Sequence, residues 1–263
     1  MNKKLHQNIL FYILGIILVV FVFQILSWVK NNEYFLPNVG SIFSSFFTLL
    51  GNSNTWISII YTIKNVFLSI ILSFIIGIFF AVIAYKSNII YQILKPLMMV
   101  FRFIPLIIVI SILFYLFYRQ DEITLYFCVC SFLVPMIYES VYQGIKGIDK
   151  SYIDVYRLHS SFNLKILFRV YLPLTFSSCK SAFLNSIGLG IKVCLSVEFI
   201  CSMTNTLGFL IKNEINSLEG FTNVYAFLLI LILISIILEL IPILISYLYK
   251  KIKYREKEIK IEY

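Results

Sequence analysis

Three long stretches without a charged residue constrain what this chain can fold into. No Lys, Arg, Asp or Glu lies between Lys4 and Lys30, between Lys64 and Lys86, or between Glu219 and Glu239. A helix needs about 20 mainly apolar residues to cross the hydrocarbon core of a bilayer. Hydrophobic residues make up 60% of the sequence and charged residues only 13%, whereas soluble proteins carry roughly a quarter charged residues. The chain is therefore predicted to be an all-α integral membrane protein.

We predict about six membrane-spanning helices. Beyond the three uncharged stretches, three further segments are shorter or carry polar residues, and their assignment depends on their neighbours. One of them contains two prolines but keeps an unbroken apolar run, IPLIIVISILFYLFY, after Arg102. The expected spans are Ile9 to Trp28, Trp56 to Ala84, Leu94 to Tyr118, Ile123 to Ile145, Thr175 to Ile200 and Val224 to Tyr249.

The distribution of Lys and Arg orients these spans, because basic residues in short loops are retained on the cytoplasmic side. With both termini in the cytoplasm, fourteen basic residues lie inside and three outside. The outer ones are Lys30, Arg119 and Lys212, and the inner ones are Lys3, Lys4, Lys86, Lys146, Lys150, Arg157, Lys165, Arg169, Lys250, Lys251, Lys253, Arg255, Lys257 and Lys260. Topology and anionic lipid account for the net charge of +9, without a nucleic-acid partner.

The predicted organisation has three parts. Residues 1–55 form an N-terminal anchor span and an external interfacial segment, in which SIFSSFFTLL at 41–50 predicts a short amphipathic helix. Residues 56–249 form a core of five spans that includes a cytoplasmic loop at 146–173, and residues 250–263 form a basic cytoplasmic tail. The first span lacks a small-x-small cleavage site after it, so we interpret it as a retained anchor.

Two patterns within the spans are typical of helix packing. In the second span, small residues recur every four positions, which lets another backbone approach closely. They are Ser69, Ser73, Gly77 and Ala81. The five cysteines all fall within or at the ends of spans and are interpreted as small apolar packing residues. They are Cys128, Cys130, Cys179, Cys194 and Cys201.

The fifth span carries a polar stripe that indicates a different role. Its small and polar residues are spaced three and four apart and so share one helix face. They are Ser177, Ser181, Asn185, Gly188, Lys192 and Ser196. An ammonium in a membrane needs water or a counter-charge, so Lys192 is expected to face a cavity or a carboxylate, either Glu139 or Glu239. We take Glu139, Ser181, Asn185, Lys192 and Glu239 as candidates for a translocation pathway, and interhelical packing as the alternative role.

The longest polar interruption lies between Lys150 and Pro173. Ser151 followed three residues later by Asp154 fits a capping box, which predicts that a short helix begins there. A helix in a basic loop between spans is placed to receive force from a soluble partner. This makes transport the leading functional class.

On this loop the chain resembles the membrane-spanning permease subunits of binding-protein-dependent ABC importers. Asp154 stands where that family has Glu, Val155 and Tyr156 where it has alanines, and Ser160 where it has glycine; Leu172-Pro173 closes the segment as in the family. Three further segments are similar to its third span, its fourth span and the Leu-Gly turn after its fifth. They read LKPLMMVFRFIPLIIVISILF at 94–114, FLVPMIYESVYQGIKGID at 132–149 and VEFICSMTNTLGFLI at 197–211.

Together these segments are similar to the nitrate, sulfonate and taurine branch, with a type I permease fold. The resemblance implies a prokaryotic cell-membrane location and a homodimer of permease copies. It also implies an external solute-binding protein and cytoplasmic ATPase subunits, which bind the ATP and Mg while this chain holds no cofactor. A coupling helix would dock on the ATPase through residues of the loop. These are Tyr152, Ile153, Asp154, Tyr156, Arg157, Ser160, Ser161 and Phe162. The solute would be a small anion or a vitamin precursor.

Two other functional classes are also compatible with a helical membrane protein. The sequence has no G-x-x-x-x-G-K-[ST] loop and so cannot itself cradle ATP; an ATP-independent secondary transporter or channel for a small anion would not need one. Such a protein would also need no coupling helix. A membrane-embedded enzyme would need a nucleophile with a base, or a metal cluster, at membrane depth, and no such pattern is present in the sequence. The chain is therefore expected to be a transport subunit and not an enzyme.

Overall fold

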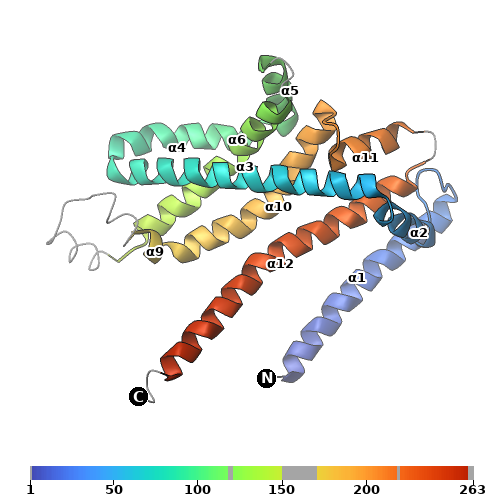
Figure 1. Ribbon diagram of the computed structural model, residues 1–263, viewed down its shortest axis with the longest axis horizontal. Helices are drawn as coiled ribbons and strands as arrows, with labels where there is room; N and C mark the ends of the chain where they lie inside the picture. Colours follow the sequence, from blue (N-terminus) through green and yellow to red (C-terminus); the bar gives the residue numbers. More distant parts are fainter. Residues whose placement is uncertain (1, 118–120, 150–170, 218–219, 260–263) are drawn as a thin grey trace.

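The computed structural model describes residues 2–117, 121–149, 171–217 and 220–259, and every regular element in these ranges is helical (Figure 1). The predicted all-α membrane fold is confirmed. The elements are α1 (Asn2–Lys30), α2 (Val39–Leu50), α3 (Ser53–Lys86), α4 (Asn88–Phe103), α5 (Leu106–Leu116), α6 (Asp121–Lys146), α9 (Leu172–Leu174), α10 (Phe176–Cys201), α11 (Leu207–Asn216) and α12 (Thr222–Ile259).

Four helices in the described ranges are long and apolar enough to cross a membrane. They are α3, and the segments Glu122–Lys146, Phe176–Cys201 and Thr222–Leu244 of α6, α10 and α12. Together, α4 and α5 pass the same test as one broken span. The first predicted span corresponds to α1, of which Leu14–Lys30 counts as a shorter apolar helix. Each predicted span thus has a helical counterpart.

The third predicted span, Leu94 to Tyr118, is not a continuous helix. Helix α4 ends at Phe103, α5 begins at Leu106, and the two helices are bent by 101°. The cause is local: a residue before proline is pushed out of the helical region, and Ile104 is extended, with φ −69° and ψ 127°, directly before Pro105. Because apolar residues continue across the break, the sequence pattern alone suggested one span.

An arginine holds the bent pair against the core. Arg102, in the last turn of α4, donates from Nη2 to the carbonyl oxygen of Pro135 in α6 at 3.1 Å. A charged donor to a carbonyl is among the stronger hydrogen bonds in proteins. The position of the bend relative to α6 is therefore fixed by a specific contact as well as by apolar packing.

The core of the molecule is built from α3, α6 and α10. The small-residue ladder of α3 faces this core, since Ser69, Ser73 and Ala81 are all 0% exposed. A Cβ added to Gly77 would lie only 2.7 Å from Ile137 Cγ2 in α6. The backbones of α3 and α6 therefore approach closely at this glycine, which confirms the packing interpretation of the ladder.

The cysteines also pack in this core. Cys128, Cys130, Cys194 and Cys201 are buried in α6 and α10, and Cys179 is partly buried near the start of α10. Small polarizable side chains fill gaps between helices well. Their predicted role as packing residues is confirmed by this burial.

A second, smaller apolar cluster joins α2 and α11 to the ends of the long helices. It is formed by Phe46 of α2, Ile59 of α3, Leu207 of α11 and Phe227 of α12, together with their neighbours. The predicted helix at 41–50 is present as α2, which begins two residues earlier at Val39. Its Asn38 cap accepts a hydrogen bond from the Ser41 amide, as helix starts require.

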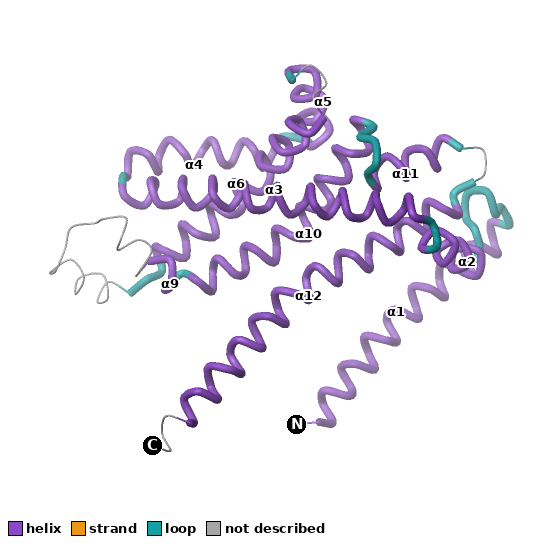
Figure 2. Tube along the Cα trace, viewed as in Figure 1, coloured by secondary structure: helices purple, strands orange, loops and turns teal. Residues whose placement is uncertain are grey.

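The arrangement separates two ends of the molecule. Figure 1 shows α2 and α11 at the right, whereas α9 and the start of α4 lie at the left and the outer ends of α1 and α12 lie below. The tube view shows the long helices running between these two ends (Figure 2). Many apolar side chains of α1, α5 and α12 are exposed, as expected for faces that meet lipid.

Candidate functional site

The polar stripe predicted on the fifth span lies on the outside of the single chain. In α10, Ser177, Ser181, Asn185 and Lys192 are exposed and the stripe residues Gly188 and Ser196 are half-buried, whereas many residues on the other faces of the helix are buried. The buried set includes Ala182, Ser186, Ile187, Gly190, Ile191, Val193, Cys194 and Val197. Most apolar residues of α10 therefore face the core, whereas its polar stripe faces outward, the reverse of what a lipid-facing helix requires.

Part of this stripe opens into a cavity of about 380 Å³ between α10 and α12, which has both polar and apolar side chains in its lining. Asn185, Gly188 and Lys192 of α10 line it together with Glu239 of α12. The cavity thus brings together an ammonium, a carboxylate and an amide, which can hold a small polar solute through charge and hydrogen bonds. Three of the five predicted pathway residues meet here.

Gly188 lets the two helices place these groups close together. A Cβ at this position would lie 3.2 Å from Oε1 of Glu239. The glycine therefore leaves room for the carboxylate beside α10. Of the two carboxylates considered as neighbours of Lys192, Glu239 is the one that lines the same cavity.

The other two predicted pathway residues lie elsewhere. Ser181 is exposed one helical turn before Asn185, on the same face of α10. Glu139 lies on α6, where Oε1 accepts a hydrogen bond from Nε2 of Gln143 at 2.8 Å. Neither lines the cavity that contains Lys192.

The predicted ATPase-docking residues lie outside the described part of the chain. All eight fall within residues 150–170, as do Ser151 of the capping box and Lys150, Lys165 and Arg169 of the inner charge count. The closing Leu172-Pro173 pair is described and forms the one-turn helix α9, directly before α10. Among the described residues, no group of three or more His, Cys, Asp or Glu side chains is placed to hold a metal ion.

A buried carboxylate near the end of α10 was not among the predicted site residues. Glu198 is 0% exposed. Its Oε2 accepts from Thr62 Oγ1 at 2.8 Å and from the Gly208 amide at 3.3 Å, and its Oε1 accepts from Asn65 Nδ2 at 3.1 Å. The Cys194 thiol lies 3.6 Å from Oε1. Glu198 therefore links α10 to both α3 and α11.

The turn between α10 and α11 is shaped around this carboxylate. Thr62 Oγ1 also accepts a hydrogen bond from the Leu207 amide at 3.0 Å, so one threonine bridges Glu198 and the first turn of α11. A Cβ on Gly208 would lie 2.5 Å from the Glu198 Cβ and 2.7 Å from the Phe199 nitrogen. Only glycine fits between these atoms.

A sequence signal for this network exists on α3. Thr62 and Asn65 precede Ser69 and Ser73 at spacings of three and four, so the small-residue ladder extends into a polar face of the same helix. A polar face within a span predicts a polar partner on a neighbouring helix. The sequence did not identify which carboxylate would meet it.

Taken together, the fold and the cavity define a class of protein: a multi-spanning helical membrane protein with a polar face on one span. The family comparison agrees with this class. Residues 73–254 match the model of the binding-protein-dependent transport system inner membrane component, and the chain belongs to this family. It is a permease component of an ABC importer. No curated protein matches the chain significantly.

Proposed function

We propose that this chain forms the solute pathway of an ATP-driven importer of the nitrate, sulfonate and taurine branch. Two copies would face each other across the polar stripe of α10. The solute would be a small organic or inorganic anion, or a small vitamin precursor, delivered by an external binding protein.

The observation that carries this proposal is the outward-facing polar side of α10. Asn185 and Lys192 are exposed within a helix that is otherwise long and apolar enough to span the membrane. An exposed ammonium in hydrocarbon costs at least a few kcal/mol. A water-filled path between two copies of the chain removes that cost, because it hydrates Lys192 and keeps lipid away from the stripe.

The charges of the cavity favour a particular kind of solute. Lys192 supplies a positive charge for a sulfonate or nitrate, and Glu239 supplies a negative charge in the same cavity. A zwitterion that carries both a sulfonate and an ammonium, such as taurine, matches both groups. Complementary charges on two sides of a solute give specificity as well as affinity.

The energy source is proposed to be a separate ATPase. The sequence contains no phosphate-binding loop of its own. The distribution of Lys and Arg supports a cytoplasmic position for both termini and for the loop at 146–173. In this topology the loop faces the compartment that contains ATP, and ATP-driven closure of two ATPase subunits would shift the spans between two states.

The test is uptake of radiolabelled taurine, with nitrate as a second probe, in vesicles that contain the chain, its ATPase and its binding protein. Lys192→Met should lower uptake about tenfold or more, because it removes a charge-assisted contact. Lys95→Met, which changes an exposed lysine of α4 outside the cavity, should leave uptake unchanged. Normal uptake by Lys192→Met, or uptake without any ATPase, would overturn the proposal.

A further inference from the structure

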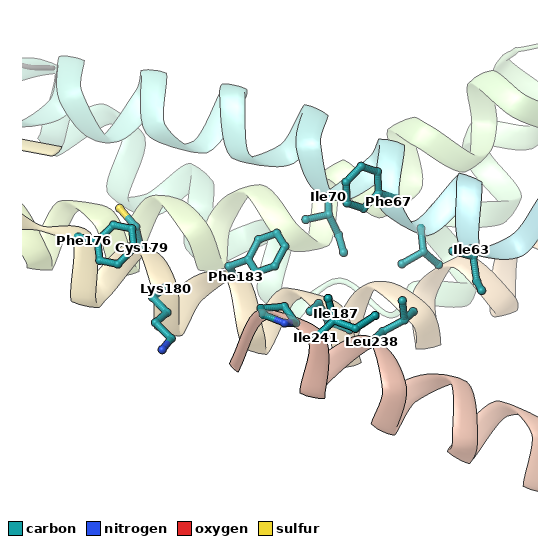
Figure 3. Close-up of a pocket in the computed structure, with 12 residues that line it drawn as sticks. Ile63, Phe67, Ile70, Phe176, Cys179, Lys180, Phe183, Ile187, Leu238 and Ile241 are labelled. Carbon is teal, nitrogen blue, oxygen red and sulfur yellow. The ribbon is translucent and has the colours of Figure 1, made fainter. Parts of the chain in front are cut away.

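A second cavity, distinct from the one that contains Lys192, lies between α3, α10 and α12. Its volume is about 480 Å³. Its lining is apolar except for one charged residue, Lys180. Figure 3 shows side chains of the three helices around this groove, with Lys180 at one end and its nitrogen directed away from the apolar residues. The groove does not share a lining residue with the cavity that contains Lys192.

We propose that this groove binds one acyl chain of an anionic phospholipid, with the phosphate of the lipid headgroup on Lys180. A small polar solute is excluded by the lining, since Ile70, Phe183 and Ile187 offer it no hydrogen-bond partner. Burial of apolar area is what stabilises an occupant of such a groove. A lipid chain supplies apolar surface along its whole length.

The groove is long enough to hold the acyl chain of a lipid in one leaflet. Along α10 it extends from Phe176 to Ile187, which at roughly 1.5 Å per residue is about 16 Å. One leaflet contributes half of a hydrocarbon core of about 30 Å, or about 15 Å. On α3 the lining continues to Ile63, next to Thr62, which donates a hydrogen bond to Glu198 of α10, so the groove extends beyond Ile187. An acyl chain of one leaflet can therefore lie in it, parallel to the helices, from one surface to the bilayer centre.

The position of the charge fits a headgroup. Lys180 lies one turn inside the first residue of α10 and is partly buried. Its apolar stem lines the groove while its ammonium points away from the apolar side chains, the arrangement of lysines at membrane surfaces. Basic pockets between spans on the cytoplasmic side bind anionic headgroups. In the proposed topology the start of α10 lies on that side.

The test places the full chain in phosphatidylcholine vesicles doped with a phospholipid that carries a photoreactive acyl chain. One sample contains the phosphatidylglycerol form of this probe and a second contains the phosphatidylcholine form. After irradiation, mass spectrometry maps the adducts. Labelling of residues 176–187 and 238–242 should be about fivefold stronger with the anionic probe, the preference expected from one lysine near the membrane surface.

Two variants and one control make the result specific. Lys180→Met should abolish the preference, so that the anionic and the phosphatidylcholine probes label the groove about equally. Ile241→Trp, on a half-exposed groove residue of α12, should lower labelling by both probes because the indole fills the groove. Lys95→Met removes a charge that lies outside the groove, so this variant should be labelled to the same extent as the unchanged chain.

Several outcomes would overturn the proposal. They are equal labelling by the two probes, equal effects of Lys180→Met and Lys95→Met, and an absence of adducts in the groove. The last result is expected if a helix of a second copy fills the groove instead of lipid. The probe is present in both leaflets and no transport is measured. Failure of this test is therefore distinguishable from failure of the proposed transport function or of the proposed orientation.

Discussion

At the scale of single residues, the polar groups of this chain fall into two sets with different surroundings. Glu198 is buried and accepts hydrogen bonds from α3 and α11. Asn185, Lys192 and Glu239 are exposed around an open cavity. A buried and satisfied carboxylate fixes packing, whereas exposed charges at membrane depth indicate a path for polar solutes.

Replacing Glu198 should therefore affect stability. Glu198→Ala leaves the Thr62 hydroxyl, the Asn65 amide and the Gly208 N–H without their acceptor. Unsatisfied buried donors cost about 1–3 kcal/mol each in soluble proteins and less in membranes, so we expect a loss of about 2–4 kcal/mol, measured by thermal unfolding in detergent.

The matched control for this variant is Glu239→Ala, which removes an exposed carboxylate from α12. This control should unfold at the temperature of the unchanged chain. Glu198→Gln keeps the shape of the side chain but turns one acceptor into a donor, so its stability should fall between the two. Unfolding of Glu198→Ala at the same temperature as the control would show that the buried network contributes nothing.

The two residue sets were not equally predictable from the sequence. The stripe on α10 was visible because all its members lie on one helix and the helical period places them on one face. The network around Glu198 joins residues more than 130 positions apart. No local period encodes which helices pair, so the polar face of α3 was recognisable but its partner was not.

At the scale of elements, hydropathy predicted where helices lie better than it predicted their directions. The long uncharged stretches became α1, α3 and α12. The break between α4 and α5 was missed, although Pro105 was a signal for it, because the apolar run continues across the proline. Hydropathy indicates whether a segment prefers lipid or water, but it carries no information about the direction of the helix axis.

The contact between α3 and α6 gives a prediction about helix packing. Gly77→Ala should destabilise the fold by about 1–3 kcal/mol, the usual cost of overpacking, because the new methyl would lie 2.7 Å from Ile137 Cγ2 and 3.0 Å from its Cβ. Branching at the Ile137 Cβ leaves that side chain few alternative rotamers. Thermal unfolding in detergent measures the loss.

Gly190→Ala is the matched control, since it makes the same substitution at another buried glycine of the core. The nearest atom to its new methyl would be Ile70 Cγ1 at 3.5 Å, an ordinary contact distance. This variant should keep the stability of the unchanged chain. If both alanines were tolerated equally, α3 and α6 would not be in close contact at Gly77.

At the scale of the whole molecule, the family and the helical architecture were both predictable from the sequence. The family match over residues 73–254 supports the same class that the order of the motifs indicated. The branch of the family, the solute, the pairing of two copies and the ATPase contacts remain proposals. These properties depend on surfaces that contact other molecules. The sequence of one chain shows such surfaces only through its own exposed polar groups and does not show the molecules that bind there.

The most direct test of the central claim asks whether the polar face of α10 meets water inside the membrane. Single cysteines are introduced at Asn185 and at Ile237 in a chain whose own five cysteines are replaced. Both positions are exposed in the single chain, with Ile237 at 55%. Ile237 lies two residues from Glu239, which lines the same cavity as Asn185, so the two cysteines lie at similar depths.

The readout is the reaction of each cysteine with a charged, membrane-impermeant thiol reagent in vesicles that expose both surfaces. Asn185→Cys should react because it lines a water-filled path, and Ile237→Cys should not react because it faces lipid. No reaction at either position, or equal reaction at both, would contradict the claim that α10 carries the solute pathway.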